Sequence, residues 1–221
     1  MNSLPPTSPL ITLCLADDHA VVRDGLQLLL EAQPDIRVIG VAANGREAVE
    51  QARTLNPVLI IMDISMPELN GIEATRQIIY FAPATKIIVL SMHATSEHIF
   101  RAMEAGAQGY VLKESAGQEV VAAVRAVMSG HRYLSQRIAD TLDIDYLGTR
   151  AIPLRGPLER LSTREREVLQ QVVEGRSSKE IAEGLHLSPK SVDTYRSRLM
   201  LKLGIHDVPG LVKFAIEHGL T

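Results

Sequence analysis

The sequence of 221 residues has no tryptophan, only three phenylalanines and a single cysteine, and these shortages exclude several classes of protein. Because Cys14 cannot form an internal disulfide and lies in an apolar run, we expect a buried side chain in a reduced, cytoplasmic protein. No cluster of cysteine and histidine has the spacing of a zinc site. The apolar runs are too short to cross a bilayer, and the Pro-rich start lacks the basic segment of a secretory signal.

Net charge is also small, at −3, but it is unevenly distributed. Residues 1–150 contain 12 basic and 17 acidic side chains, whereas residues 151–221 contain 11 basic and 9 acidic ones. Excess negative charge disfavours contact with nucleic acid, while a mildly basic segment permits it. The two parts of the chain are therefore expected to have different partners, and DNA is possible only for the second.

Short apolar runs alternate with amphipathic segments throughout residues 10–129. The first amphipathic segment has apolar residues at Val22, Leu26, Leu29 and Leu30, which is a helical spacing. Strict strand–helix alternation predicts an α/β, doubly wound, five-stranded parallel sheet of order 2-1-3-4-5, with right-handed crossovers and helices on both faces. The expected strands are residues 10–16, 36–42, 58–62, 86–91 and 109–113.

The alternation stops at Gly130, and the pattern after it predicts a different architecture. Residues 133–147 have the composition for one more helix, and residues 148–156 have no periodicity. After Leu161, each amphipathic segment opens with Ser, Thr or Asp and closes near Gly or a polar turn, as helices do. We therefore predict a domain at 10–130, a linker at 131–157 and a small all-α domain at 158–221.

Polar side chains stand at the carboxyl ends of four of the expected strands. Asp17 and Asp18 follow the first strand and Asp63 follows the third, while Ser91 ends the fourth and Lys113 ends the fifth. Each alone has an ordinary explanation as a strand cap or a solvated loop residue. Together, at the carboxyl edge of a parallel sheet, crowded carboxylates favour a Mg²⁺ ion, while the hydroxyl and the ammonium form an anion pocket. This combination is suited to phosphoryl transfer onto a carboxylate.

Residues 10–129 resemble the receiver domain of bacterial two-component response regulators, through the paired aspartates and the motifs MDISMPELNG, LSMH and GYVLK. The resemblance implies that Asp63 accepts a phosphoryl group from a phosphohistidine of a sensor kinase. It also implies that Asp18, Asp63 and the backbone carbonyl of Ser65 ligate Mg²⁺, with Asp17 acting through water.

The same resemblance assigns a switch beside the phosphorylation site. Ser91 would bond a phosphoryl oxygen, Lys113 would pair with the phosphoaspartate, and Tyr110 would swing inward as Ser91 is drawn to the phosphate. Such a local charge change biases a bistable element. His93 follows Ser91 by two residues and either tunes the lifetime of the phosphate or is a solvated loop residue.

The segment LSTREREVL through SPKSVDTYRSRLMLKLG predicts a helix–turn–helix. Ile181, Ala182 and Leu185 form an apolar face, Ser188 is the expected cap of the next helix, and Pro189 begins that helix. Other faces of this helix are expected to meet the major groove of DNA with Lys190, Ser191, Asp193, Thr194, Ser197 and Arg198. The expected phosphate contacts are Arg176, Lys179, Arg196 and Lys202.

An acid in such a helix repels phosphate, so we expect Asp193 to face a base edge or to restrain Arg196. The alternative for the whole segment is a helical dimerisation module with a solvated charged face. The segment, however, resembles the LuxR-type DNA-binding domain throughout, and the chain as a whole resembles NarL/FixJ-type regulators of the GacA/BvgA-like branch. This resemblance implies that the last helix pairs two domains through Val208, Leu211, Val212, Ala215 and Ile216; otherwise that helix only covers the core.

The function expected from these observations is a cytoplasmic transcription factor that is phosphorylated by a sensor histidine kinase and binds promoter DNA as a homodimer. RNA polymerase is a possible further partner, and no membrane partner is expected. We expect no enzymatic turnover beyond self-catalysed phosphorylation and dephosphorylation. An aspartyl-phosphate phosphohydrolase is disfavoured because it needs an acid where Ser65 stands. A DNA-binding regulator with an inert receiver is the other alternative.

Overall fold

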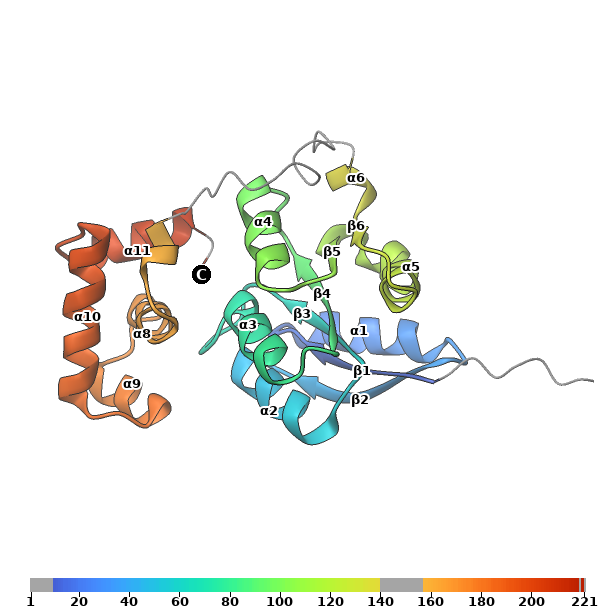
Figure 1. Ribbon diagram of the computed structural model, residues 1–221, viewed down its shortest axis with the longest axis horizontal. Coiled ribbons are helices and arrows are strands. Elements are labelled where there is room, and N and C mark those ends of the chain that lie inside the picture. The colour runs from blue at the N-terminus through green and yellow to red at the C-terminus, as the bar shows by residue number, and fades with distance from the viewer. Residues whose placement is uncertain (1–9, 140–156, 219, 221) are drawn as a thin grey trace, which may run out of the picture. The chain divides into compact units, whose positions relative to one another are not determined.

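The computed structural model describes residues 10–139, 157–218 and 220 of the chain (Figure 1). Two compact units separate near residue 142. Each unit has its own hydrophobic core, and each is described below by itself.

The first unit is built on a parallel sheet of order β2-β1-β3-β4-β5-β6. β3 is buried along its whole length, as expected for a strand covered on both faces. The predicted doubly wound architecture is therefore confirmed, and one further strand extends it. The strands are β1 (Ile11–Ala16), β2 (Ile36–Ala42), β3 (Leu59–Asp63), β4 (Lys86–Ser91), β5 (Gly109–Leu112) and β6 (Tyr133–Leu134).

Helices cover both faces of this sheet (Figure 1). Side chains of α1 and α5 form one core with β1, β3, β4 and β5, and the two helices contact one another. The helices α2, α3 and α4 contact one another in sequence and lie on the opposite face. The bounds are α1 (Ala20–Glu31), α2 (Gly45–Leu55), α3 (Gly71–Phe81), α4 (Ser96–Glu104) and α5 (Ala116–Met128), with the 3-10 turn η1 (Lys113–Ser115) before α5.

The structure corrects the boundary predicted at residue 130. The backbone amide of Tyr133 donates to Gln108, and that of Ser135 donates to Tyr110, so β6 adds to the sheet edge. Ser135 is fully buried and its hydroxyl accepts from the amide of Leu112. The short helix α6 (Gln136–Ala139) follows, so the first unit includes residues that we had assigned to the linker. The rest of the predicted helix and residues 148–156 lie outside the described residues.

Hydroxyl side chains stand at the start of two helices of this unit. The α4 cap is Thr95, whose hydroxyl accepts from the amide of His98, and Ser96 is already helical. Ser115 precedes α5 but makes no cap, because its hydroxyl donates to the carbonyl of Leu112 instead. A one-residue ambiguity among neighbouring hydroxyls is common at helix ends.

The second unit is a small helical domain, as predicted. It contains the 3-10 turn η2 (Pro157–Arg160) and the helices α8 (Thr163–Val173), α9 (Ser178–Leu185), α10 (Pro189–Leu203) and α11 (Val208–Glu217). Ser162, Ser177, Ser188 and Asp207 cap the four helices with their side chains, and the first two form complete capping boxes. These caps satisfy backbone amides that a helix leaves without partners.

The core of the second unit brings together the apolar faces of all four helices. Val192 and Leu199 of α10 are fully buried in one core with Ile181 and Leu185 of α9. The turn between these helices places His186 in the left-handed region at φ 54°. Among the described residues, no helix has the length and hydropathy needed to span a membrane.

Candidate functional site

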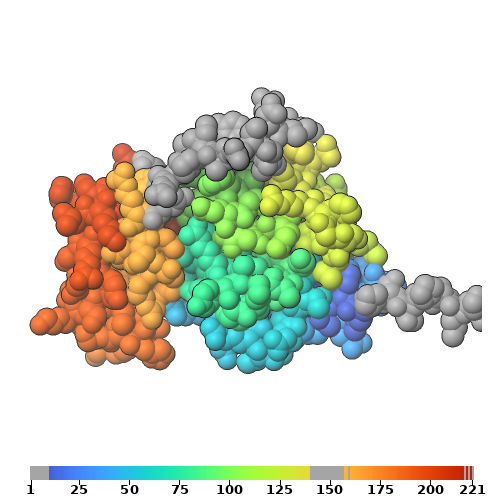
Figure 2. Space-filling view, in the orientation of Figure 1, coloured from blue at the N-terminus to red at the C-terminus, as the bar shows by residue number. Residues whose placement is uncertain are grey.

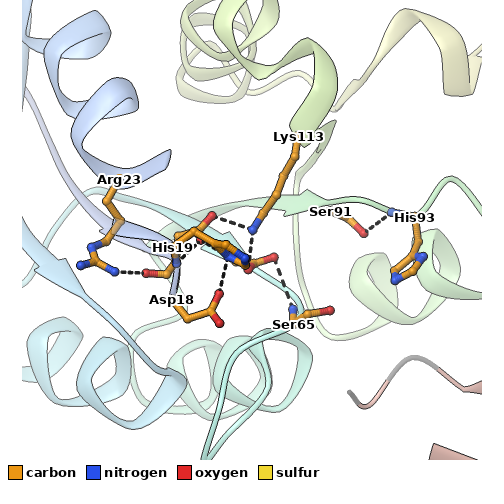
Figure 3. A network of polar contacts seen from close by, with 9 residues as sticks. Asp18, His19, Arg23, Ser65, Ser91, His93 and Lys113 are labelled. Atoms are coloured by element: carbon orange, nitrogen blue, oxygen red, sulfur yellow. Dashed lines mark hydrogen bonds and ion pairs between the residues drawn. The ribbon is translucent and has the colours of Figure 1, made fainter. Parts of the chain in front are cut away.

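The acidic side chains predicted from the strand ends meet at one edge of the sheet (Figure 3). The register aligns Ala16 of β1 with Met62 of β3, so Asp17 and Asp63 come next in the two neighbouring strands. Their side chains are each 2% exposed. Asp18 continues the loop and is more open to water. The pattern of strand ends therefore located this cluster correctly.

Lys113 connects the two buried acids. Its ammonium lies 2.6 Å from Oδ2 of Asp63 and 2.8 Å from Oδ2 of Asp17, and its own side chain is largely buried. β5 ends at Leu112, so η1 begins at the lysine and brings it back over the ends of β1 and β3. The second oxygen of Asp63 accepts a long bond, 3.3 Å, from the amide of Ser65.

Burial dominates the ionisation of this pair. The pKa of Asp63 is raised to about 6, first by burial and then by the charge of Asp17, although the bond to Lys113 opposes both effects. Burial alone would lower the pKa of Lys113, but the bonds to Asp17 and Asp63 outweigh it and the pKa is raised. Asp63 is consequently ionised at neutral pH but poorly solvated, which is a suitable state for a nucleophile.

The loop after β3 depends on Gly71, the last residue of the motif MDISMPELNG. A Cβ atom at this position would lie 1.9 Å from the backbone oxygen of Asp63. The amide of Gly71 donates to the carbonyl of Ile64, which folds the loop back onto the strand end. Any side chain here would push the strand end that holds Asp63. The Asn-Gly pair indicated the turn, but the close approach is visible only in three dimensions.

Ser91 is the last residue of β4, and Tyr110 lies within the neighbouring strand β5. The hydroxyl of Ser91 accepts from the amide of His93 at 2.9 Å, and that of Tyr110 donates to the carbonyl of His93 at 2.8 Å. The Tyr110 ring is fully buried, and burial raises its pKa to about 12. Tyr110 is therefore in the inward position in this structure, and the loop after β4 connects it to Ser91.

The helix α10 lies at the surface of the second unit (Figures 1 and 2), and it carries exposed polar side chains there. Lys190, Thr194, Ser197 and Arg198 are exposed along it, and Arg196 is partly exposed. The hydroxyl of Thr194 donates to the carbonyl of Lys190, so it is partly used within the helix. Outside α10, Lys179 is exposed at the start of α9, and Arg176 is partly exposed just before that helix.

Both units of the chain are similar to known proteins. Residues 13–125 match the family model of the response regulator receiver domain, and residues 159–215 match that of the bacterial regulatory proteins of the luxR family. The chain is 40% identical to the response regulator UvrY of Escherichia coli K12 over 211 residues, and the alignment covers 96% of each protein. The chain belongs to the LuxR-type two-component response regulators. It is a DNA-binding regulator of transcription with an N-terminal receiver, as the motifs predicted.

Two further relatives share this organisation along their whole length. The oxygen regulatory protein NreC of Staphylococcus carnosus is 36% identical over 212 residues, 94% of this response regulator and 98% of NreC. A crystal form of the RcsB response regulator of Salmonella typhimurium is 26% identical, with a TM-score of 0.58, over 95% of this chain and 99% of that one. Receiver and DNA-binding domain therefore occur in the same order in all three.

Several residues of the DNA-binding domain are not placed as predicted. The ammonium of Lys202 lies 2.6 Å from Oε2 of Glu165, so Lys202 joins α10 to the capping box of α8 rather than extending freely towards a phosphate. Leu211 and Ala215 of α11 are fully buried in the domain's own core and cannot contact a second copy. Ile216 is exposed and Val208 and Val212 are partly buried, so this narrower set remains for pairing.

Asp193 of this response regulator also has a partner inside the domain. Its Oδ1 accepts from the hydroxyl of Ser178 at 2.8 Å, which links α10 to the first residue of α9. This bond occupies one carboxylate oxygen on the side facing α9. We had expected a base contact or a restraint on Arg196, and the structure favours a role in fixing the angle between the two helices.

Replacing Ser178 with Ala is expected to weaken DNA binding about fivefold, by the same factor for specific and unrelated sequences. One hydrogen bond between helices contributes about 1 kcal/mol, and its loss loosens α10 without removing a base contact. Fluorescence anisotropy with both kinds of duplex measures this effect.

Asp193→Asn supplies the matched control, because an Asn oxygen still accepts from Ser178 while the charge is lost. We expect this variant to retain the sequence preference of the wild type. If Asp193→Asn changes the preferred sequence and Ser178→Ala does not, Asp193 reads a base directly and the interhelical role is rejected.

Proposed function

We propose that Asp63 accepts a phosphoryl group from a phosphohistidine of a sensor histidine kinase. The observation that supports this most is the placement of a buried, raised-pKa carboxylate 2.6 Å from a buried ammonium. An oxygen of Asp63 attacks phosphorus, the O–P bond forms and the P–N bond breaks. The electron pair of that bond stays on the imidazole nitrogen of the kinase. Lys113 would pair with the phosphoryl group, and Ser91 would bond one of its oxygens.

We further propose that Asp17, Asp18 and Asp63 hold a Mg²⁺ ion, with the backbone carbonyl of Ser65 as an additional ligand. Ligand atoms of the three acids lie within 4.8 Å of one another, and carboxylates are the hard donors that Mg²⁺ prefers. Their combined charge exceeds that of Lys113, so a divalent cation would relieve the repulsion. When bound, the ion would neutralise the oxygens of the incoming phosphoryl group.

The output is proposed to be binding of promoter DNA by a homodimer in the cytoplasm. Support comes from the basic, exposed face of α10. Further support comes from RcsB, which is 25% identical to this chain and has been solved in complex with DNA and as dimers bound to DNA. The base-reading set consists of Lys190, Ser191, Thr194, Ser197 and Arg198, and the proposed phosphate contacts are Arg176, Lys179 and Arg196. Contact with RNA polymerase would follow at the promoter. No turnover beyond the receiver's own phosphorylation and dephosphorylation is proposed.

Treatment of the full chain with acetyl phosphate and Mg²⁺ is expected to add one phosphoryl group and to tighten operator binding about tenfold, within the usual range of coupling between sites. Asp63→Asn should lose both effects because it lacks the nucleophile. Intact-mass spectrometry measures the added phosphoryl group. Footprinting on genomic fragments identifies the operator and measures the change in its affinity.

Asp24→Asn, an exposed change on α1, is the matched control and should behave as the wild type. Equal DNA binding by treated wild type and Asp63→Asn would indicate an inert receiver. Release of many phosphates per protein molecule would instead indicate a phosphohydrolase. Either result contradicts the proposal.

A further inference from the structure

The acidic pocket contains a nitrogen donor in addition to its carboxylates. Nδ1 of His19 lies 2.7 Å from Oδ1 of Asp18 and 3.2 Å from Oδ1 of Asp17. Among the described residues, these three and Asp63 form the single group of acid, histidine or cysteine side chains with ligand atoms close enough to share an ion, all within 4.8 Å. The imidazole therefore belongs to the same constellation as the three acids (Figure 3).

The backbone holds His19 in this position. Its amide donates to Oδ1 of Asp17 at 2.8 Å, and it is the last residue before α1. Arg23, one turn into α1, donates to the backbone carbonyl of Asp17, which fixes the loop from the other side. The ring itself is 64% exposed, so it lies at the mouth of the pocket and not in a packed core. It can adjust towards an ion without disturbing other side chains.

An imidazole changes which cations such a pocket prefers. Carboxylates, carbonyls and water suit both Mg²⁺ and Mn²⁺, whereas imidazole is a ligand of transition metals, for which affinity rises from Mn²⁺ towards Cu²⁺. Two ligands at right angles around an ion with bonds of about 2.1 Å stand about 3 Å apart. The separations of Nδ1 from the two carboxylate oxygens are close to this value. A transition metal therefore gains a ligand from His19 that Mg²⁺ scarcely uses.

We propose that His19 is a metal ligand of the acidic pocket and gives this receiver a preference for Mn²⁺ over Mg²⁺. The inference rests on the proposed function, because it concerns the same cation site. The alternative is that the imidazole only donates a hydrogen bond to Asp18 and never contacts the ion. Direct ligation and a hydrogen bond alone predict different effects of removing the imidazole on the affinities for Mn²⁺ and for Mg²⁺.

Mn²⁺ alone is the probe, bound to the full chain at pH 8. Pulsed electron paramagnetic resonance is expected to show ¹⁴N modulation from a directly bound imidazole in the wild type. His19→Gln should abolish this modulation and weaken Mn²⁺ binding about tenfold or more, the lower limit seen when even an outer partner of a metal site is lost. Mg²⁺ affinity should change less than about threefold.

His93→Ala is the matched control, since this histidine follows Ser91 on another strand, and it should keep both the ¹⁴N signal and the affinity. Absence of ¹⁴N modulation in the wild type, or equal losses for Mn²⁺ and Mg²⁺ in His19→Gln, overturns the inference. Asp63→Asn tests the cation site separately from the role of His19. If Mn²⁺ binds the wild type and Asp63→Asn equally well, the cation site itself is wrong and the proposed function fails with it.

Discussion

A Lys113→Met variant is expected to lower the free energy of unfolding of the receiver unit by about 3–5 kcal/mol. Its ammonium lies 2.8 Å from Asp17 and 2.6 Å from Asp63, and both carboxylates are 2% exposed. Removal of one partner from a buried ionic group leaves the other charges without compensation in a poorly solvated site. The measurement is hydrogen exchange of β3 and β4 amides in the full chain at increasing urea concentrations, with divalent cations chelated.

Lys86→Met is the matched control, because Lys86 begins β4 at the opposite edge of the same sheet and is only partly buried. Its effect is expected to stay within about 0.5 kcal/mol. In the double variant Lys113→Met/Asp63→Asn, one of the two uncompensated carboxylates is removed. Part of the lost free energy of unfolding should therefore return. Equal effects of Lys113→Met and Lys86→Met would show that the lysine does not compensate the acids.

The acidic site was predictable because strand ends in a parallel sheet share one edge. A carboxylate, a hydroxyl or an ammonium directly after a buried strand must lie at this edge once the strand order is known. Asp63, Ser91 and Lys113 all satisfied this rule, and the apolar runs before them were unambiguous. Motif resemblance then supplied the chemistry, which strand positions alone do not specify.

The sequence was less informative where a contact joins residues on different elements. Periodicity placed Leu211 and Ala215 on an apolar face of α11, but it did not distinguish the domain's own core from a partner's surface. Lys202 has the charge for a phosphate contact, and only the packing of α10 against α8 shows that it meets Glu165. β6 was missed because two residues are too few to show a strand period.

Ionisation of Asp63 is expected to cost the receiver stability, which makes the phosphorylation site a strained part of the fold. Asp63→Asn should therefore raise the free energy of unfolding by about 2–3 kcal/mol at pH 8 without divalent cations, since a shift of one pKa unit corresponds to about 1.4 kcal/mol. The bond between Lys113 and Asp17 remains in this variant. The same amide-exchange measurement in urea, repeated from pH 8 to pH 4, tests the prediction.

The sign of the pH dependence follows from the direction of the pKa shift. The pKa of Asp63 is raised by burial to about 6 in the folded protein, against 3.8 for an ordinary aspartate. The full penalty on the wild type applies above pH 6, where folding must bury the charge. Most of it is lost as pH falls towards 4, where the folded state is protonated and the unfolded state is about half protonated. The advantage of Asp63→Asn should shrink to about 0.5 kcal/mol over this window. Asp24→Asn, an exposed change, should show no such trend, and a constant advantage of Asp63→Asn at all pH values would reject burial of charge as its cause.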